Sequence, residues 1–294
     1  MILHLFLDAG LVPLLAAGIV TLVATWCGAS RSVACAWGSA IGLLAGLVAL
    51  KSGAGFAPAF RAFALEPHEA ADWLPTIIVL ALGASIVLLA TPQGNRRCWF
   101  WLVGYLAAAA SLRLLSGNVR LNGAWTPFEK VYHLAILVAT FSAVWLLLAS
   151  APDDEQSPAR FVFLCILAVG SAAALTLAGV FVYGLSCGAL AAALVGTALA
   201  SLMTRAPRGG RPTSRLPNIS GAAGIITFSL GSLIILGHYF ADLSIASAVL
   251  LFASLAAAGA PFPASLPGST WRQISVRGVA CLLPLAIAIK LSMA

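Results

Sequence analysis

Histidine and carboxylate side chains recur in this sequence at a spacing of four residues. Each of the four histidines has an aspartate or a glutamate four positions before or after it. Residues four apart lie on the same face of a helix, where an acid and a base interact favourably. The pairs are His4/Asp8, His68/Asp72, Glu129/His133 and His238/Asp242.

Proton or cation coupling is the first chemistry that such pairs suit. Histidine changes its charge near neutral pH, and ionisable groups beside apolar helices mark transport paths. The spacing therefore favours a coupling or binding site. The residues expected to form it are His68, Glu69, Asp72, Arg113, Glu129, His133, His238 and Asp242.

A divalent metal ion is a weaker alternative. A histidine and an acid four apart can reach one ion, as in the His-Glu-x-x-His helix of zinc peptidases. The stretch from His68 to Asp72 has this register, but an aspartate stands where the second histidine would be. The metal candidates are His68, Asp72, His133 and His238, and no other cofactor is expected.

Two further interpretations compete with a coupling site. Arg61, Arg113 and Arg120 could bind an anionic headgroup in an enzyme that acts on a lipid-linked substrate. Alternatively the acids only stabilise helix ends, because a carboxylate in a first turn complements the helix dipole. Thr126-Pro-Phe-Glu129 has the form of a capping box and predicts that a helix begins there.

The elements that must position these residues are apolar helices. Hydrophobic residues make up 61% of the chain, charged residues 9%, and the mean hydropathy is +1.02. Soluble domains carry about 25% charged residues, so a water-soluble globule is excluded. We therefore expect an all-α, polytopic transmembrane bundle, with residues 1–294 forming a single integral-membrane domain.

Ten apolar runs are close to the roughly 20 residues that cross a bilayer. The division of residues 160–203 into two spans has the least support. Only Tyr183, Gly184 and Ser186 indicate a turn between them. Pro284 is expected to kink the tenth helix, and Gly38, Gly42 and Gly46 to pack closely against another helix. The runs are 5–26, 33–50, 73–91, 98–116, 128–150, 161–183, 185–203, 218–237, 242–260 and 276–292.

A division into residues 1–150 and 161–294 puts five spans in each half, as an inverted repeat requires. No similarity between the two halves demonstrates such a repeat. The connections of this arrangement include outer loops at 51–72 and 117–127 and a cytoplasmic loop at 204–217.

Basic residues indicate the orientation. The net charge is +7, and the arginines lie singly or in small groups between apolar runs, which argues against nucleic acid as a partner. More basic residues, among them Arg160 and Arg277, fall on the side of the 204–217 loop. The positive-inside rule then puts both termini outside a bacterial inner (plasma) membrane.

These observations favour a small permease-like transporter, proton- or cation-coupled, with a His/carboxylate site at its outer face. The alternatives are a non-catalytic scaffold or subunit of a larger membrane complex, and the membrane enzyme described above. No motif indicates catalysis. The expected partners are the lipid bilayer and either a solute or another membrane protein.

Overall fold

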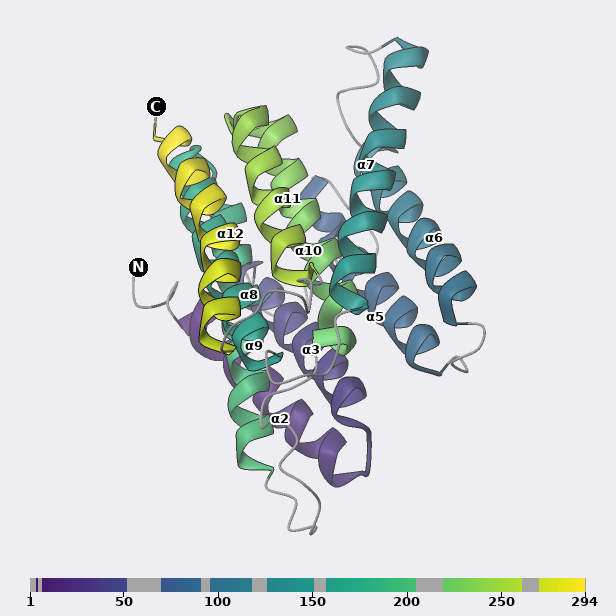
Figure 1. Ribbon diagram of the computed structural model, residues 1–294, viewed down its shortest axis with the longest axis vertical. Coiled ribbons are helices and arrows are strands. Elements are labelled where there is room, and N and C mark those ends of the chain that lie inside the picture. The colour runs from purple at the N-terminus through teal and green to yellow at the C-terminus, as the bar shows by residue number, and fades with distance from the viewer. Residues whose placement is uncertain are drawn as a thin grey trace.

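The computed structural model describes residues 4, 7–51, 70–90, 96–117, 126–150, 157–204, 219–260 and 270–293. In these ranges the protein is an all-α bundle without strands (Figure 1). Its longer elements are η1 (Leu7–Leu11), α2 (Val12–Trp26), α3 (Arg31–Lys51), α5 (Leu74–Ala90), α6 (Arg96–Gly117), α7 (Pro127–Ala149), α8 (Ser157–Leu177), α9 (Phe181–Met203), α10 (Ile219–Phe240), α11 (Ile245–Gly259) and α12 (Thr270–Leu291). A short 3₁₀ helix, η3 (Ala70–Trp73), precedes α5.

These elements correspond to the ten predicted spans, with η1 and α2 together making the first. Eight of the helical segments are long and apolar enough to cross a membrane. The apolar parts of the other two are shorter, Phe100–Arg113 in α6 and Ile245–Gly259 in α11. The described chain is thus an apolar helix bundle of the kind found in multi-pass membrane proteins.

Helices that follow one another in the chain run in opposite directions. Gly221, at the start of α10, lies against Ser32 at the start of α3, and Gly237, at the end of α10, lies against Leu175 of α8. These three helices therefore run the same way. We use two names for the ends of the bundle. The Asp72 end is the one where α3 ends and α5 begins. The Arg277 end is the opposite one, where α8 and α12 begin.

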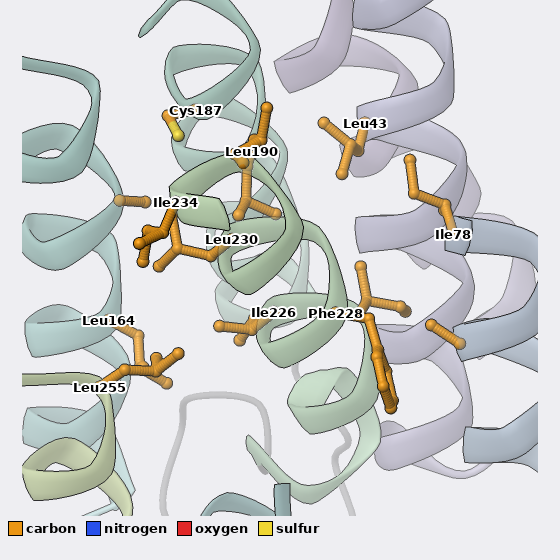
Figure 2. Close-up of a cluster of buried hydrophobic side chains, with 14 of the residues drawn as sticks. Leu43, Ile78, Leu164, Cys187, Leu190, Ile226, Phe228, Leu230, Ile234 and Leu255 are labelled. Carbon is orange, nitrogen blue, oxygen red and sulfur yellow. The ribbon is translucent and has the colours of Figure 1, made fainter. Parts of the chain in front are cut away.

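Helix α10 is the centre of the bundle. Of its apolar span 94% is buried inside the protein, against 22% for the first span. Figure 1 shows α10 between α8 and α12 on one side and α5, α6 and α7 on the other. In Figure 2, Ile226, Phe228, Leu230 and Ile234 of α10 lie within the apolar cluster that neighbouring helices complete. Burial on all sides explains why this helix is apolar around its whole circumference.

The glycine stripe of α3 packs closely, as predicted. A Cβ at Gly42 would come within 2.8 Å of the Pro13 carbonyl of α2 and 2.9 Å of Ala193 Cβ of α9. Gly38 lies against Thr21 and Thr197 of the same two helices. The absent side chains let three backbones approach one another.

The turn between the sixth and seventh spans was placed wrongly. Residues 160–203 do form two helices, but the turn lies at 178–180 and not at Tyr183–Ser186. Gly179 makes the turn in the left-handed region, with φ of +88°, and its N–H donates to the Thr176 carbonyl at 3.2 Å. Gly184 lies inside α9, packed against Thr176.

The tenth helix also differs from the prediction. It begins at Thr270 and not near residue 276, so Arg277 lies two turns inside it. Pro284 lies within α12, and the helix continues past it to Leu291.

Residues 52–69, 118–125 and 205–218 hold most of the three predicted loops and lie outside the described residues. The arrangement in two five-helix halves stays a prediction.

Candidate functional site

A buried carboxylate paired with a lysine lies at the Asp72 end. The Asp72 side chain is 3% exposed and the Lys51 side chain 31%. Lys51 Nζ donates a hydrogen bond to Asp72 Oδ1, which forms an ion pair across 21 residues of sequence. Among the described residues Asp72 is the only buried carboxylate.

Three elements position this pair. Lys51 is the last residue of α3, and Asp72 lies in η3, directly before α5. Leu74, Ile77 and Ile78 of α5 are buried in the core, so the start of this helix is held against the bundle. The pair thus joins the ends of two neighbouring helices in apolar surroundings, where the attraction between opposite charges is stronger than in water.

Glu129, a predicted site residue, forms the cap at the start of α7. Its Oε2 accepts from the Thr126 backbone N–H at 2.8 Å, and the Glu129 N–H donates to Thr126 Oγ1 at 3.3 Å. This is the predicted capping box. Glu129 therefore has a structural role in the cap. Its carboxylate also interacts electrostatically with His133, its predicted partner, and its part in a shared site stays a prediction.

His238 also has a structural contact. Its Nδ1 lies 2.9 Å from the Leu243 carbonyl oxygen, which closes the turn between α10 and α11. A carbonyl can only accept, so Nδ1 carries the proton and donates it. Asp242, the predicted partner of His238, is exposed beside this turn.

The remaining predicted residues are spread over the Asp72 end. His133 is half-buried in the second turn of α7, and its ring lies 5.9 Å from the Tyr132 ring. Arg113 is exposed near the end of α6, His4 is exposed and Asp8 is half-buried. His68 and Glu69 lie outside the described residues, so their part in a shared site stays a prediction.

Metal ligands do not gather in the described ranges. No group of three or more histidine, cysteine, aspartate or glutamate side chains there could hold an ion. Because His68 lies outside those ranges, the metal alternative also stays a prediction.

A set of buried hydroxyls surrounds the middle of α10. Thr227, Ser229 and Ser232 of α10 are at most 1% exposed, and within the described part of the chain their oxygens have no hydrogen-bond partner. Other buried hydroxyls, such as Ser39 and Ser85, donate to the carbonyl four residues earlier, at 2.6 Å and 2.8 Å. A buried hydroxyl without a hydrogen-bond partner lowers the stability of the fold by about 1–3 kcal/mol. A water molecule or a polar solute that bonded to these hydroxyls would remove this cost.

Neighbouring helices add polar atoms of the same kind. They too are buried and have no hydrogen-bond partner in the described ranges, and they are Ser111 Oγ of α6, Ser142 Oγ and Trp145 Nε1 of α7, and Ser171 Oγ of α8. Trp145 lies against Phe228 of α10, with ring centroids 5.5 Å apart. The interior of the bundle is therefore apolar but has scattered uncharged hydrogen-bonding groups.

Two buried arginines at the Arg277 end were not predicted. Arg160 is 2% exposed and Arg277 is 1% exposed, although both were counted as charges of the connections. Arg277 Nη2 donates to the Ala260 carbonyl, at the end of α11, at 3.1 Å. Their position beside apolar spans was visible in the sequence, but orientation by positive charge explained it without burial.

Comparison of this chain with protein-family models, with curated proteins and with solved structures finds no match. The evidence on function is therefore the geometry described above.

Proposed function

We propose that this chain is a small permease-like membrane protein whose solute or coupling ion engages the Asp72–Lys51 pair. The observation that carries the proposal is the burial of Asp72 in an apolar bundle. Ionisable groups inside membrane-spanning segments are costly, and they commonly mark solute or ion paths. This is a narrower site than the eight residues expected from the sequence.

The pair supplies a simple coupling step. A proton or a small cation bound at the Asp72 carboxylate cancels the charge that holds the Lys51 ammonium. Lys51 is partly exposed, so its long side chain can then extend toward the headgroups. Release of the pair loosens the contact between the end of α3 and the start of α5, which opens the Asp72 end.

The hydroxyls around α10 would form the next part of the path. They can both donate and accept hydrogen bonds and carry no charge. Such groups suit a small polar solute that leaves the ion pair and crosses the middle of the bundle.

We further propose a bacterial inner membrane with both chain termini outside, so that the Asp72 end faces outward. Asp242 and Ser150 are exposed at opposite ends of the bundle and allow a test. In whole cells, a membrane-impermeant maleimide is expected to label Asp242→Cys and not Ser150→Cys, in a background without native cysteines. The reverse labelling would invert the orientation.

Transport itself is tested with the purified protein in liposomes on a solid-supported membrane. The liposomes are challenged with a panel of amino acids, sugars, organic anions and alkali cations, from about pH 5 to about pH 8. We expect a solute-evoked current that Asp72→Asn abolishes. Asp242→Asn, which changes an exposed acid at the same end, is expected to keep the current.

Two outcomes would contradict the proposal. An absence of current for every solute, together with no change in thermal stability on adding any of them, would favour a scaffold or a subunit of a larger complex. A current that is the same in wild type and Asp72→Asn would remove the ion pair from the mechanism.

A further inference from the structure

We propose that Trp145 of α7 and Ser85 of α5 form a binding site for one hydroxyl group, beside Gly224 of α10. We call it the hydroxyl site. Its ligand is a water molecule or the alcohol group of a neutral solute. Use of the site by a solute rests on the proposed function, because the site continues the uncharged polar groups around α10. Binding of the hydroxyl itself does not depend on transport.

The indole of Trp145 has a hydrogen-bond donor without a partner. The residue is 0% exposed, and in the described part of the chain its Nε1 makes no hydrogen bond. Buried N–H groups are nearly always bonded to a protein atom or to an ordered water molecule, because an unpaired one destabilises the fold. An indole nitrogen only donates, so the missing partner is an acceptor.

Packing fixes the direction of this donor. The benzo edge of the indole lies against Gly104 of α6, where a Cβ would be 2.7 Å from Trp145 Cε3. Cε3 and Nε1 are on opposite edges of the ring system, so the N–H points away from Gly104. The rings of Phe100 and Phe228 lie 5.2 Å and 5.5 Å from the Trp145 ring and restrict its rotation.

Gly224 of α10 lies beside both the donor and an acceptor. A Cβ at this glycine would be 3.8 Å from Trp145 Nε1 and 2.5 Å from Ser85 Oγ. Ser85 is 1% exposed, and its hydroxyl donates to the Ala81 carbonyl at 2.8 Å. That hydrogen bond uses the only proton of the hydroxyl, so Ser85 Oγ can only accept from a further partner.

One ligand atom can connect the two groups. Trp145 Nε1 and Ser85 Oγ do not bond to each other, although both lie close to the same point beside Gly224. An oxygen atom with hydrogen bonds of about 2.9 Å has the size to bridge them. Buried water molecules are held by about two to four partners of this kind. An alanine methyl group at position 224 would cover both polar atoms, and glycine leaves them uncovered.

The bridging atom must accept from the indole and donate to the serine. A hydroxyl does both. A carbonyl or ether oxygen only accepts and an ammonium group only donates, so each would leave one of the two protein groups unpaired. Both protein groups are uncharged and lie among aromatic rings, where a charged ligand would lose its hydration without compensation.

The position of the site suits the path proposed above. Trp145 is one turn before the end of α7, and Gly224 is in the second turn of α10, so the hydroxyl site is nearer to the Arg277 end. Thr227 and Ser229 follow Gly224 along α10 in the direction of the ion pair. A solute released from the ion pair would meet these hydroxyls first and the hydroxyl site afterwards.

Nuclear magnetic resonance of the Trp145 N–H tests the proposal directly. The full-length protein in a neutral detergent carries heavy nitrogen in its tryptophan indoles, and Trp145→Phe identifies the resonance. We expect a nuclear Overhauser effect between this N–H and water. Ethylene glycol is the probe for a solute hydroxyl. Its dimethyl ether, which accepts but cannot donate, is the matched control compound.

The two compounds distinguish a solute from water. A saturable shift of the resonance by ethylene glycol, and none by the ether, identifies a site for a solute hydroxyl. A water signal that ethylene glycol leaves unchanged identifies a resident water molecule.

Variants assign the signals to the two protein groups. Ser85→Ala removes the acceptor, so it is expected to weaken the binding of ethylene glycol about tenfold and to reduce the water signal. Ser39→Ala is the matched control, because Ser39 is a buried serine that donates to its own helix in the same way. This variant is expected to give the signals of the wild type.

Two results would overturn the proposal. The first is a Trp145 N–H that shows neither a water signal nor a response to ethylene glycol. The second is wild-type signals in Ser85→Ala. The proposed function fails separately: a hydroxyl bound at Trp145, without any solute-evoked current, would keep the site and remove transport. A current that persists when Trp145 binds no hydroxyl would keep transport and remove the site.

Discussion

At the Asp72 end a buried carboxylate lies beside an ammonium group, whereas at the Arg277 end Arg160 and Arg277 are buried and Arg277 donates to the Ala260 carbonyl. The first arrangement is neutral in sum, and one proton or cation can break it. In the second, Arg277 donates a hydrogen bond to a backbone carbonyl at the end of α11, and an arginine side chain does not lose its charge. Buried charge in one small bundle can therefore serve a contact that a proton or cation can break at one end and a permanently charged contact at the other.

The two ends also differ in how their helices touch. At the Arg277 end Gly221 of α10 lies against the backbone of Ser32 in α3. At the Asp72 end Gly237 of the same helix lies against the side-chain ends of Leu175 and Leu243. Backbone atoms cannot move aside for a new methyl group as the end of a leucine side chain can. The Arg277 end is thus the more rigid part of α10, and the Asp72 end is better suited to opening.

The largest expected effect is that of Lys51→Met, which leaves Asp72 buried without its lysine. We expect a loss of about 3 kcal/mol near neutral pH. This is the low end of the range for broken buried pairs, because Lys51 is 31% exposed and solvent screens it. Asp72→Asn is expected to cost less, since Lys51 can extend to the headgroups. Chemical denaturation in detergent measures the loss of stability in both variants. An equal loss would contradict the expectation that the buried Asp72 depends on the pair more than the partly exposed Lys51 does.

Gly221→Ala tests the rigid contact at the Arg277 end. The new methyl group meets the Ser32 carbonyl, so α3 and α10 must separate, and we expect a loss of about 2 kcal/mol. Gly237→Ala is expected to lose less than about 1 kcal/mol, because leucine side chains can adjust. Gly188→Ala, with nothing within 4 Å, is the control and is expected to be neutral or slightly stabilising. Equal losses of stability in Gly221→Ala and Gly237→Ala would contradict the difference in rigidity between the two ends of α10.

His238→Ala separates the structural contact from the predicted acid–base pair. Loss of the hydrogen bond to the Leu243 carbonyl is expected to cost about 1 kcal/mol and to speed hydrogen exchange in the turn before α11. Asp242→Ala is expected to change neither the stability nor the hydrogen exchange of this turn. If the two substitutions have the same effect, His238 acts through Asp242 and the assigned contact is wrong.

The smallest effect is expected for Thr126→Ala, at the exposed start of α7. The substitution removes the capping hydroxyl, so the first turn should fray and exchange its amide hydrogens faster. The global unfolding midpoint is expected to change little. Thr140→Ala, further along α7, is the control, and unchanged protection of residues 127–130 in Thr126→Ala would show that the cap does not hold the helix start.

The fold could largely be predicted from the sequence, because span length and apolarity follow from the bilayer. The turn at Gly179 was missed since its neighbours Ala178 and Val180 are as apolar as the helices, and a tight turn needs only one glycine. The start of α12 was missed because its first turns contain Arg272, Gln273 and Arg277, which resemble a polar connection.

The site was harder to predict. The spacing of four residues compares groups on one helix, whereas Asp72 is paired with Lys51 across a connection. The same rule singled out Glu129 and His238, whose hydrogen-bond partners are the Thr126 cap and the Leu243 carbonyl. Arg160 and Arg277 are buried by the packing of the helices, which spacing along the chain does not indicate.

The central claim is that Lys51 and Asp72 form a buried pair that holds the ends of α3 and α5 together, and a double-mutant cycle tests it most directly. Free energies of unfolding are measured for the wild type, Lys51→Met, Asp72→Leu and the double variant. We predict that the double variant recovers most of the loss seen in Lys51→Met, with a coupling energy of about 1–3 kcal/mol. Additive losses, with a coupling energy near zero, would contradict the pair and the function built on it.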